Sequence, residues 1–136
     1  MVQKYVSGPL LVGGKKFDLR IYVLFKGYSP HIEAYVCEEG MARFCTQDYK
    51  KPNKDNLKNL FMHLTNFSLN KNSEDYKAPP DVDFFDDATG SKRLLSSLYK
   101  TLAEEGHDVA KIKEQIRDTV RKAVITLEPY LVHLYH

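Results

Sequence analysis

The sequence predicts an α+β fold in which an antiparallel β-meander is followed by two helices. Polar and apolar residues alternate over residues 16–25, which is the period of a half-buried strand. Apolar residues recur every three or four positions after residue 90, which is the period of an amphipathic helix. The 136 residues, 43% of them hydrophobic and 28% charged, suit one globular domain. We therefore expect a β-rich part over residues 1–69, a flexible acidic loop over 70–90 and a helical part over 91–136.

The β-rich part contains strand-like stretches separated by turn signals. Residues 9–12 are apolar, and Gly13-Gly14 after them is a tight-turn signal. In the strand expected over 16–25, the odd-numbered side chains form one apolar face, because successive side chains of a strand point to opposite sides. Further strands are expected over 32–38 and 41–46, with turns at 27–30 and at Gly40.

Polar segments separate these strands from the helices. Residues 48–59 contain Pro52 and few apolar side chains, so we expect a surface loop there. A short apolar stretch with embedded polar residues follows at 61–67. Residues 70–90 then contain two prolines and an acidic patch, which is typical of a flexible loop. The patch consists of Asp81, Asp83, Asp86 and Asp87.

A first helix is expected over 92–105, with Gly106 as its C-terminal stop. Asp108 is the expected N-cap of a second helix, which Pro129 should end or kink. We expect the apolar stripes of both helices to pack in the core. The stripes are Leu94, Leu95, Leu98 and Leu102 in the first helix, and Val109, Ile112, Ile116, Val120, Ala123, Val124 and Leu127 in the second.

Charge and composition exclude several classes of protein. The formal net charge of +2 is too small to indicate a nucleic-acid-binding protein. No apolar run is long enough to cross a membrane, and the first residues lack the apolar segment of a secretory signal. Cys37 and Cys45 could face each other across a hairpin, but we expect reduced, buried thiols of a cytoplasmic protein.

Charged residues cluster at the start of the strand expected over 16–25. Lys16, Asp18 and Arg20 point to one face by the alternation of the strand. Two cations around a carboxylate suit a phosphate or acyl phosphate ligand, but the spacing taken alone is more typical of a structural row of ion pairs on a solvated sheet face. Arg43 follows a glycine turn and, taken alone, is typical of a surface arginine.

Three polar residues lie within the short apolar stretch near residue 65. His63, Thr65 and Asn66 need hydrogen-bond partners if they are buried. Their side chains could bind a ribose, a phosphate or backbone groups, and a hydrogen-bonded loop corner explains them equally well.

Ordered fragments over nearly the whole chain resemble the tubulin-tyrosine-ligase-like family, most of all its polyglutamylase branch. The resemblance implies an ATP-grasp fold and an ATP-dependent ligase that activates a carboxylate as an acyl phosphate, which an amine then attacks. The fragments are Gln3-Lys4-Tyr5-Val6, Pro9-Leu10-Leu11, Lys16-Phe17-Asp18-Leu19-Arg20-Ile21-Tyr22-Val23-Leu24, Glu39-Gly40-Met41-Ala42-Arg43-Phe44, His63-Leu64-Thr65-Asn66-Phe67-Ser68-Leu69-Asn70-Lys71 and Gly90-Ser91-Lys92-Arg93.

The resemblance also implies roles for individual residues. The catalytic positions near the nucleotide and the reacting carboxylate are Lys16, Asp18, Arg20 and Arg43. The positions that contact ATP are Gln3, Lys4, Tyr5 and Val6 at the adenine, and His63, Leu64, Thr65 and Asn66 in a loop that lines the nucleotide and amino-acid pocket.

The sequence departs from the family pattern in its metal site. Members bind Mg²⁺ through carboxylates and an asparagine on strands beyond the helical region. This sequence ends at His136, before any motif of that kind. Members also have phosphate-binding lysines in a part that precedes the position of Met1. We therefore expect a partial catalytic domain with no metal ligand of its own and little activity alone.

The implied function of the full-length protein is the addition of glutamate to the C-terminal tails of tubulin. Its expected partners are ATP, glutamate, tubulin tails and microtubules, and its expected location is the cytoplasmic cytoskeleton, with the cilium or basal body as candidates. One alternative is a non-catalytic or truncated module that binds acidic tubulin tails through Lys50, Lys51, Lys54 and Lys58. Another is an inert or unstable chain with exposed sheet edges.

Overall fold

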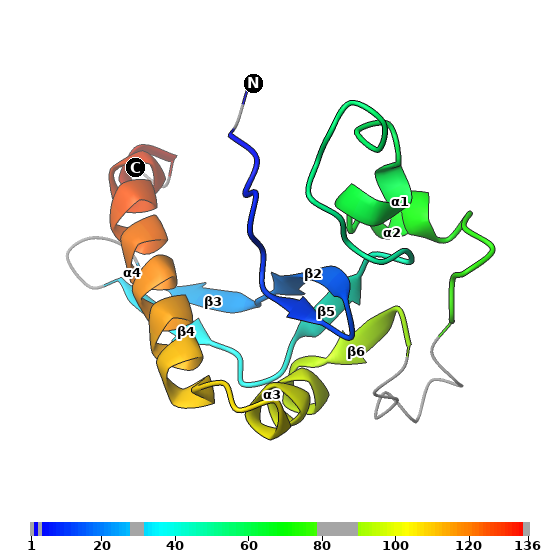
Figure 1. Cartoon of the computed structure of the whole chain (residues 1–136). Helices are drawn as coiled ribbons and strands as arrows, with labels where there is room; N and C mark the ends of the chain where they lie inside the picture. Colours follow the sequence, from blue (N-terminus) through cyan, green and yellow to red (C-terminus); the bar gives the residue numbers. More distant parts are fainter. Residues whose placement is uncertain (1, 3, 28–31, 79–89, 135–136) are drawn as a thin grey trace.

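The computed structural model describes residues 2, 4–27, 32–78 and 90–134, and its architecture is α+β, as the sequence predicts. Four antiparallel strands form the main sheet in the order β1-β2-β5-β6, and two more form a separate hairpin. The main-sheet strands are β1 (Leu11–Val12), β2 (Lys15–Arg20), β5 (Met41–Phe44) and β6 (Lys92–Leu94). The hairpin strands are β3 (Val23–Lys26) and β4 (Glu33–Val36). Figure 1 shows the sheet between helices on both of its sides.

The single strand predicted over 16–25 is wrong, because the chain divides it between two sheets. Arg20 is paired with Met41 in the main sheet, whereas Val23 is paired with Val36 in the hairpin. Two residues separate Arg20 from Val23, whereas four separate Val36 from Met41, so the segment that pairs with residues 20–23 contains two extra residues. A backbone hydrogen bond of 2.9 Å from Cys37 N to Tyr22 O spans this break in register.

Gly40 makes the break possible through its lack of a side chain. A Cβ atom at this position would lie 2.4 Å from the backbone oxygen of Arg20 and 2.7 Å from Cδ1 of Leu95. The tight turn predicted at Gly40 is wrong, because residues 37–40 contain a bend and no hydrogen-bonded turn. Gly40 has no positive φ, and it is needed for close approach instead. By contrast, Gly13 and Gly14 have φ of +55° and +75°, as the predicted two-residue turn between β1 and β2 requires.

The hydrophobic core lies between one face of the main sheet and helix α3 (Leu95–Glu104). Apolar side chains of β2 and β5 meet the leucines of α3 there, and the rings of Phe17 and Phe44 are 5.3 Å apart. The predicted apolar face of β2 is therefore the core face. The buried members of the core are Val12, Ala42, Phe44, Leu95, Leu98 and Leu102.

Two one-turn helices lie on the other side of the sheet, together with the N-terminal segment (Figure 1). They are α1 (Leu60–His63) and α2 (Phe67–Asn70), and they occupy the stretch that the sequence assigns to the β-rich part. Helices of four residues are too short to leave a periodic pattern in the sequence. The side chain of Asn70 stabilises this corner, because its Nδ2 donates to the backbone oxygens of Leu64 and Asn66 at 2.7 and 3.0 Å.

The helix predicted over 92–105 begins later than expected. Its first three residues form β6, which pairs with β5, and α3 starts at Leu95. Glu39 caps the start of α3, because Oε1 accepts from Ser96 N at 3.3 Å and Oε2 from Ser96 Oγ at 2.7 Å. Burial alone would raise the pKa of Glu39, but these bonds and that from Gly40 N together lower it.

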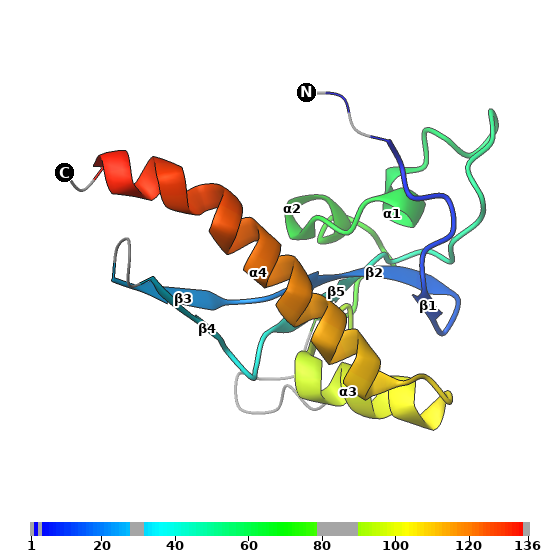
Figure 2. The same cartoon turned by 90° about the vertical axis from the view of Figure 1, so that its left-hand side faces the viewer.

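The second predicted helix is α4 (Val109–Leu134), and it continues through Pro129, so the predicted end there is wrong. Asp108 caps it as expected, with Oδ1 accepting from Lys111 N at 2.9 Å. Figure 2 shows α4 crossing in front of the sheet and lying over the β3–β4 hairpin. Within the described ranges, no helix combines the length and the apolar composition that a membrane span requires.

Both cysteines are free, and only one of them is buried. Cys45 is 1% exposed, and burial raises the pKa of its thiol to about 11. Cys37 is exposed, so the expectation of two buried thiols is correct for Cys45 alone. The acidic patch predicted at 81–87 lies outside the described residues.

A cationic sheet face as candidate functional site

The candidate site is built on the face of the main sheet that points away from α3. Asp18 on β2 is paired with Arg43 on β5, so their side chains lie on the same face. The guanidinium of Arg43 donates twice to the carboxylate, from Nε to Oδ1 at 3.1 Å and from Nη2 to Oδ2. Hydrogen bonding to Asp18 raises the pKa of Arg43 above its ordinary value. The arginine therefore has a fixed orientation, which an isolated surface arginine would lack.

Lys16 lies two residues before Asp18 on the same face and joins three distant segments of the chain. Its Nζ donates to the backbone oxygen of His63 at 2.7 Å and to the hydroxyl of Tyr5 at 3.4 Å. The ammonium also lies 4.5 Å from the centroid of the Tyr5 ring. The N-terminal segment, β2 and α1 thus meet at one lysine.

His63 completes this network as a buried residue, 5% exposed, with both ring nitrogens in contact. Nε2 lies 3.2 Å from the backbone oxygen of Asn56, and Nδ1 lies 3.3 Å from the Tyr5 hydroxyl. A carbonyl oxygen only accepts, so Nε2 carries a proton, and the Tyr5 hydroxyl is the hydrogen-bond partner of Nδ1. Burial raises the pKa of Tyr5, which keeps its hydroxyl protonated.

The other residues of this loop, 64–66, contribute backbone hydrogen bonds or side chains that are at least partly exposed. Leu64 is 41% exposed, and its backbone oxygen accepts from Asn70. The backbone oxygen of Asn66 also accepts from Asn70, and its side chain is exposed. Thr65 is half-buried beside Arg43 at the edge of the sheet face. The loop corner is therefore hydrogen-bonded through its backbone, which leaves the side chains of Thr65 and Asn66 available to a ligand.

Four predicted residues do not join these clusters. The guanidinium of Arg20 is exposed and lies 5.9 Å from the centroid of the Tyr22 ring, apart from Asp18. Lys4 and Val6 are exposed on the N-terminal segment. Gln3 lies outside the described residues.

Sequence reasoning missed two residues that belong to this face, Lys92 and Phe67. Lys92 on β6 is paired with Arg43, which extends the row of charges to a third strand. Its Nζ lies 3.5 Å from the centroid of the Phe67 ring, at the start of α2. The sequence placed Lys92 in a helix, and a three-residue strand has no period that could correct this.

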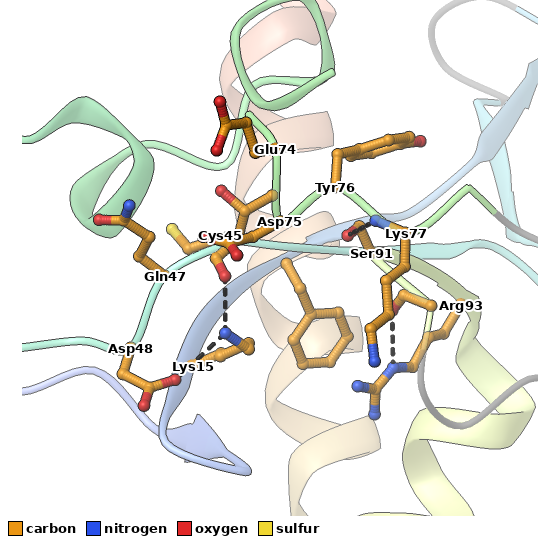
Figure 3. Close-up of a pocket in the computed structure, with 13 residues that line it drawn as sticks. Lys15, Cys45, Gln47, Asp48, Glu74, Asp75, Tyr76, Lys77, Ser91 and Arg93 are labelled. Atoms are coloured by element: carbon orange, nitrogen blue, oxygen red, sulfur yellow. Dashed lines mark hydrogen bonds and ion pairs between the residues drawn. The ribbon is translucent and has the colours of Figure 1, made fainter. Parts of the chain in front are cut away.

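We call the sheet face with Lys16, Arg43 and Lys92 the cationic face. A separate cavity of about 600 Å³ lies beside the opposite face, which carries the core. Figure 3 shows Lys15, Asp48, Asp75, Lys77 and Arg93 around it. Lys15 Nζ donates to Thr46 O at 2.6 Å and to Asp48 Oδ1 at 3.1 Å, and none of the predicted site residues lines the cavity. Its volume is therefore no guide to the chemistry of the cationic face.

The described residues do not fit a resident Mg²⁺ ion. No group of three or more histidine, cysteine, aspartate or glutamate side chains among them could hold a metal. Both oxygens of Asp18, the carboxylate on the cationic face, accept from Arg43.

Known proteins of similar sequence include several tubulin polyglutamylases. The chain is 43% identical over 135 residues to tubulin polyglutamylase TTLL11 of Mus musculus and 42% identical over 135 residues to tubulin polyglutamylase TTLL6 of Mus musculus. It is 39% identical over 135 residues to a probable beta-tubulin polyglutamylase of Tetrahymena thermophila. These matches cover 98–99% of this chain but only 11–18% of the relatives, so the chain spans less than a fifth of their length. The model of the tubulin-tyrosine ligase family matches residues 1–135, and the chain therefore belongs to that family.

Proposed function

We propose that the full-length protein is an ATP-dependent ligase that adds glutamate to tubulin tails, and that these residues supply its anion-binding face. The observation that carries the proposal is that Lys16, Arg20, Arg43 and Lys92 share one sheet face with the carboxylate of Asp18. Four cations on a face with one carboxylate leave an excess of positive charge. ATP, glutamate, an acyl phosphate and an acidic tail are all anionic, so this face suits each of them.

The proposed reaction has two steps. A carboxylate oxygen attacks the terminal phosphorus of ATP, and the bond to the bridging oxygen breaks to release ADP. The amine of the second reactant then attacks the acyl carbon, loses a proton and expels phosphate, so that an amide bond forms. Cations fixed before the reaction stabilise the negative charge on the phosphoryl and tetrahedral oxygens.

The contacts of individual side chains support a proposed role for each of them. Arg43, held by Asp18, presents a fixed guanidinium, and Arg20 offers a freer one at the end of β2. Lys4, Tyr5 and Val6 are proposed to contact the adenine, because Tyr5 places their segment next to His63. The same role is proposed for Gln3 from the family resemblance alone. Thr65 and Asn66 are proposed to bind the ribose or the amino acid.

Magnesium is part of the proposal only for the full-length protein, since the residues described here do not fit it. The proposed location is the cytoskeleton, through microtubules as substrate. Lys50, Lys51, Lys54 and Lys58 are all exposed, but nothing in the comparisons favours a purely binding role for them.

Incorporation of radiolabelled glutamate into microtubules by the full-length protein tests the proposal. Arg20→Ala and Arg43→Lys are expected to lower kcat/KM by about a hundredfold, because fixed arginines stabilise the charge of the transition state. Arg117→Ala is the matched control, since Arg117 is exposed on α4 and pairs with Glu114 in the same helix. Wild-type protein that incorporates no glutamate with ATP would refute the function, and a normal rate for Arg20→Ala would refute the role of Arg20.

A further inference from the structure

Asn70 is the least exposed polar residue among those that the structure describes, with 2% of its surface accessible. It lies at the end of α2 and makes four hydrogen bonds through its side chain. A buried amide is costly unless its donors and acceptors have partners, so these bonds are part of the stability of the corner. None of the proposed ATP-binding or catalytic roles belongs to Asn70.

The amide group of Asn70 ties the end of β5 to the loop of residues 64–66. Oδ1 accepts from Thr46 N at 3.1 Å and from Thr46 Oγ1 at 3.2 Å. Nδ2 donates to the backbone oxygens of Leu64 and Asn66 at 2.7 and 3.0 Å. The partners fix the orientation of the amide, because a backbone N–H only donates and a carbonyl oxygen only accepts. Both protons and both lone pairs of the amide group are therefore used.

Thr46 is the fixed end of this link. It is 4% exposed and follows Arg43 by three positions in the sequence. Its backbone oxygen accepts from Lys15 Nζ at 2.6 Å, and the preceding residue, Cys45, donates from its backbone N to Lys16 O at 2.8 Å. Thr46 is thus held against β2 from two sides, whereas the loop has no strand pairing of its own among the described residues.

The loop carries Thr65 between the two carbonyl groups that Asn70 holds. The backbone of Thr65 cannot shift far without breaking the bond to Leu64 O or the bond to Asn66 O. Its side chain lines the same small hollow as Arg43 on β5. The position of this side chain relative to the sheet therefore depends on Asn70.

We propose that Asn70 is a positioning residue of the ligase, which holds Thr65 and Asn66 in place against β5 and touches neither substrate itself. This inference rests on the proposed function, in which the two loop residues bind the ribose or the amino acid. Groups held in productive geometry before binding contribute to the rate, and a displacement of about 1 Å can cost roughly a hundredfold. The amide of Asn70 supports the reaction from behind the site.

Asn70→Asp in the full-length protein tests the proposal, because it changes only the group that faces the loop. The size of the side chain and the acceptor for Thr46 are kept, but Nδ2 with its two protons becomes a carboxyl oxygen. We expect kcat/KM for ATP or for glutamate to fall about tenfold or more. The KM for microtubules should stay within about twofold, which a general loss of folded protein would not explain. Unchanged kcat/KM values for both small substrates would overturn the proposal.

Thr46→Val is a milder variant of the same link. It removes the hydroxyl that donates to Asn70 Oδ1 and keeps the backbone donor and the size of the side chain. It should lower the same kcat/KM as Asn70→Asp by a smaller factor, about two- to fivefold, as expected for one lost hydrogen bond. A larger effect on the KM for microtubules than on that kcat/KM would overturn the proposal.

Asn72→Asp is the matched control, because the same substitution then changes an exposed amide two positions further along the chain. Asn72 Nδ2 donates to Ser68 O at 3.4 Å on the surface, where water replaces a lost bond. This variant should leave kcat/KM for ATP and for glutamate within about twofold of the wild-type values.

Hydrogen exchange gives a measurement that does not depend on ligation. In the folded full-length protein, peptides covering residues 64–72 should exchange about tenfold faster in Asn70→Asp than in the wild type, because the backbone N–H groups of Leu69 and Asn70 donate to Asn66 O. Peptides of α3 should keep the wild-type rate. Unchanged exchange over 64–72, or equally faster exchange in α3, would overturn the proposal, since Asn70 would then hold either nothing or the fold as a whole. Wild-type protein that ligates no glutamate would refute only the proposed function.

Discussion

At the scale of single residues, Arg43 has a structural and a chemical role at once. Its Nε and Nη2 donate to Asp18, which fixes the plane of the guanidinium, while Nη1 has no hydrogen bond to the described residues and can bind a ligand. The sequence shows that Lys16, Asp18 and Arg20 share a face, because that follows from the strand period. It cannot show that Arg43 faces Asp18, because the register of β2 against β5 depends on packing across the sheet.

The two cysteines provide a residue-scale prediction about reactivity. Thiolate is the reactive form, and Cys45 is buried with a pKa raised to about 11, whereas Cys37 is exposed. Iodoacetamide at neutral pH should therefore modify Cys37 at least about tenfold faster than Cys45. Mass spectrometry of the time course, with Cys37→Ser and Cys45→Ser variants as controls, measures both rates.

The same thiol makes stability depend on alkaline pH. The folded-state pKa of Cys45 is raised from 9.0 to about 11, so its contribution to stability is fully present below pH 9 and is lost as the pH rises towards 11. Cys45→Ser should lack this loss between pH 9 and 11. Rapid modification of Cys45 in the folded wild-type protein at neutral pH would show that the thiol is less buried than the structure indicates.

At the scale of elements, the junction of β2, β5 and α3 depends on the absence of a side chain at Gly40. An added Cβ would lie 2.4 Å from Arg20 O and 2.7 Å from Leu95 Cδ1, and a backbone oxygen cannot move aside cheaply. Gly40→Ala should therefore lower the free energy of unfolding by about 2–3 kcal/mol through overpacking. Chemical denaturation of the folded chain measures this change.

Gly8→Ala is the control for that prediction. Gly8 has no positive φ, and a Cβ atom added there would have no other atom within 4 Å, so alanine should change stability by less than about 0.5 kcal/mol. Equal stability of both variants would mean that the sheet and α3 separate more easily at Gly40 than their contacts indicate.

Element length decides which parts of the fold the sequence can predict. The turn at Gly13-Gly14 and the long helix α4 have strong local signals, and both are present. The strand β6 and the helices α1 and α2 have three or four residues, which is too short for any period. Lys92 and Phe67 lie in those short elements, which is why neither of them is among the site residues predicted from the sequence.

At the scale of the whole molecule, stability and chemistry lie on opposite sides of one sheet. The core between the sheet and α3 contains the buried apolar residues. The strand pairing places the cations on the other face, and α1, α2 and the N-terminal segment lie on that side of the sheet (Figure 1). Alternation along β2 predicts both sides, since its odd-numbered residues face the core and its even-numbered ones face away. The segments that meet over the cations are up to 58 residues apart, and only the tertiary fold brings them together.

A second consequence at this scale concerns α4, which packs against the core cluster only near its start. Ile112 packs against the core cluster, whereas Ile125 is 62% exposed at the end of an apolar groove of about 450 Å³ between α4 and β4. Ile125→Ser should change the free energy of unfolding by less than about 0.5 kcal/mol, because serine has a similar helix propensity and little burial is lost. It should also lower the fluorescence of anilinonaphthalene sulfonate bound to the 136-residue chain.

Ile112→Ser, the same substitution in the same helix, should cost about 1–3 kcal/mol through lost burial and leave that fluorescence unchanged in the folded state. Equal destabilisation by the two substitutions in urea would show instead that Ile125 is packed as tightly as Ile112 in the folded chain.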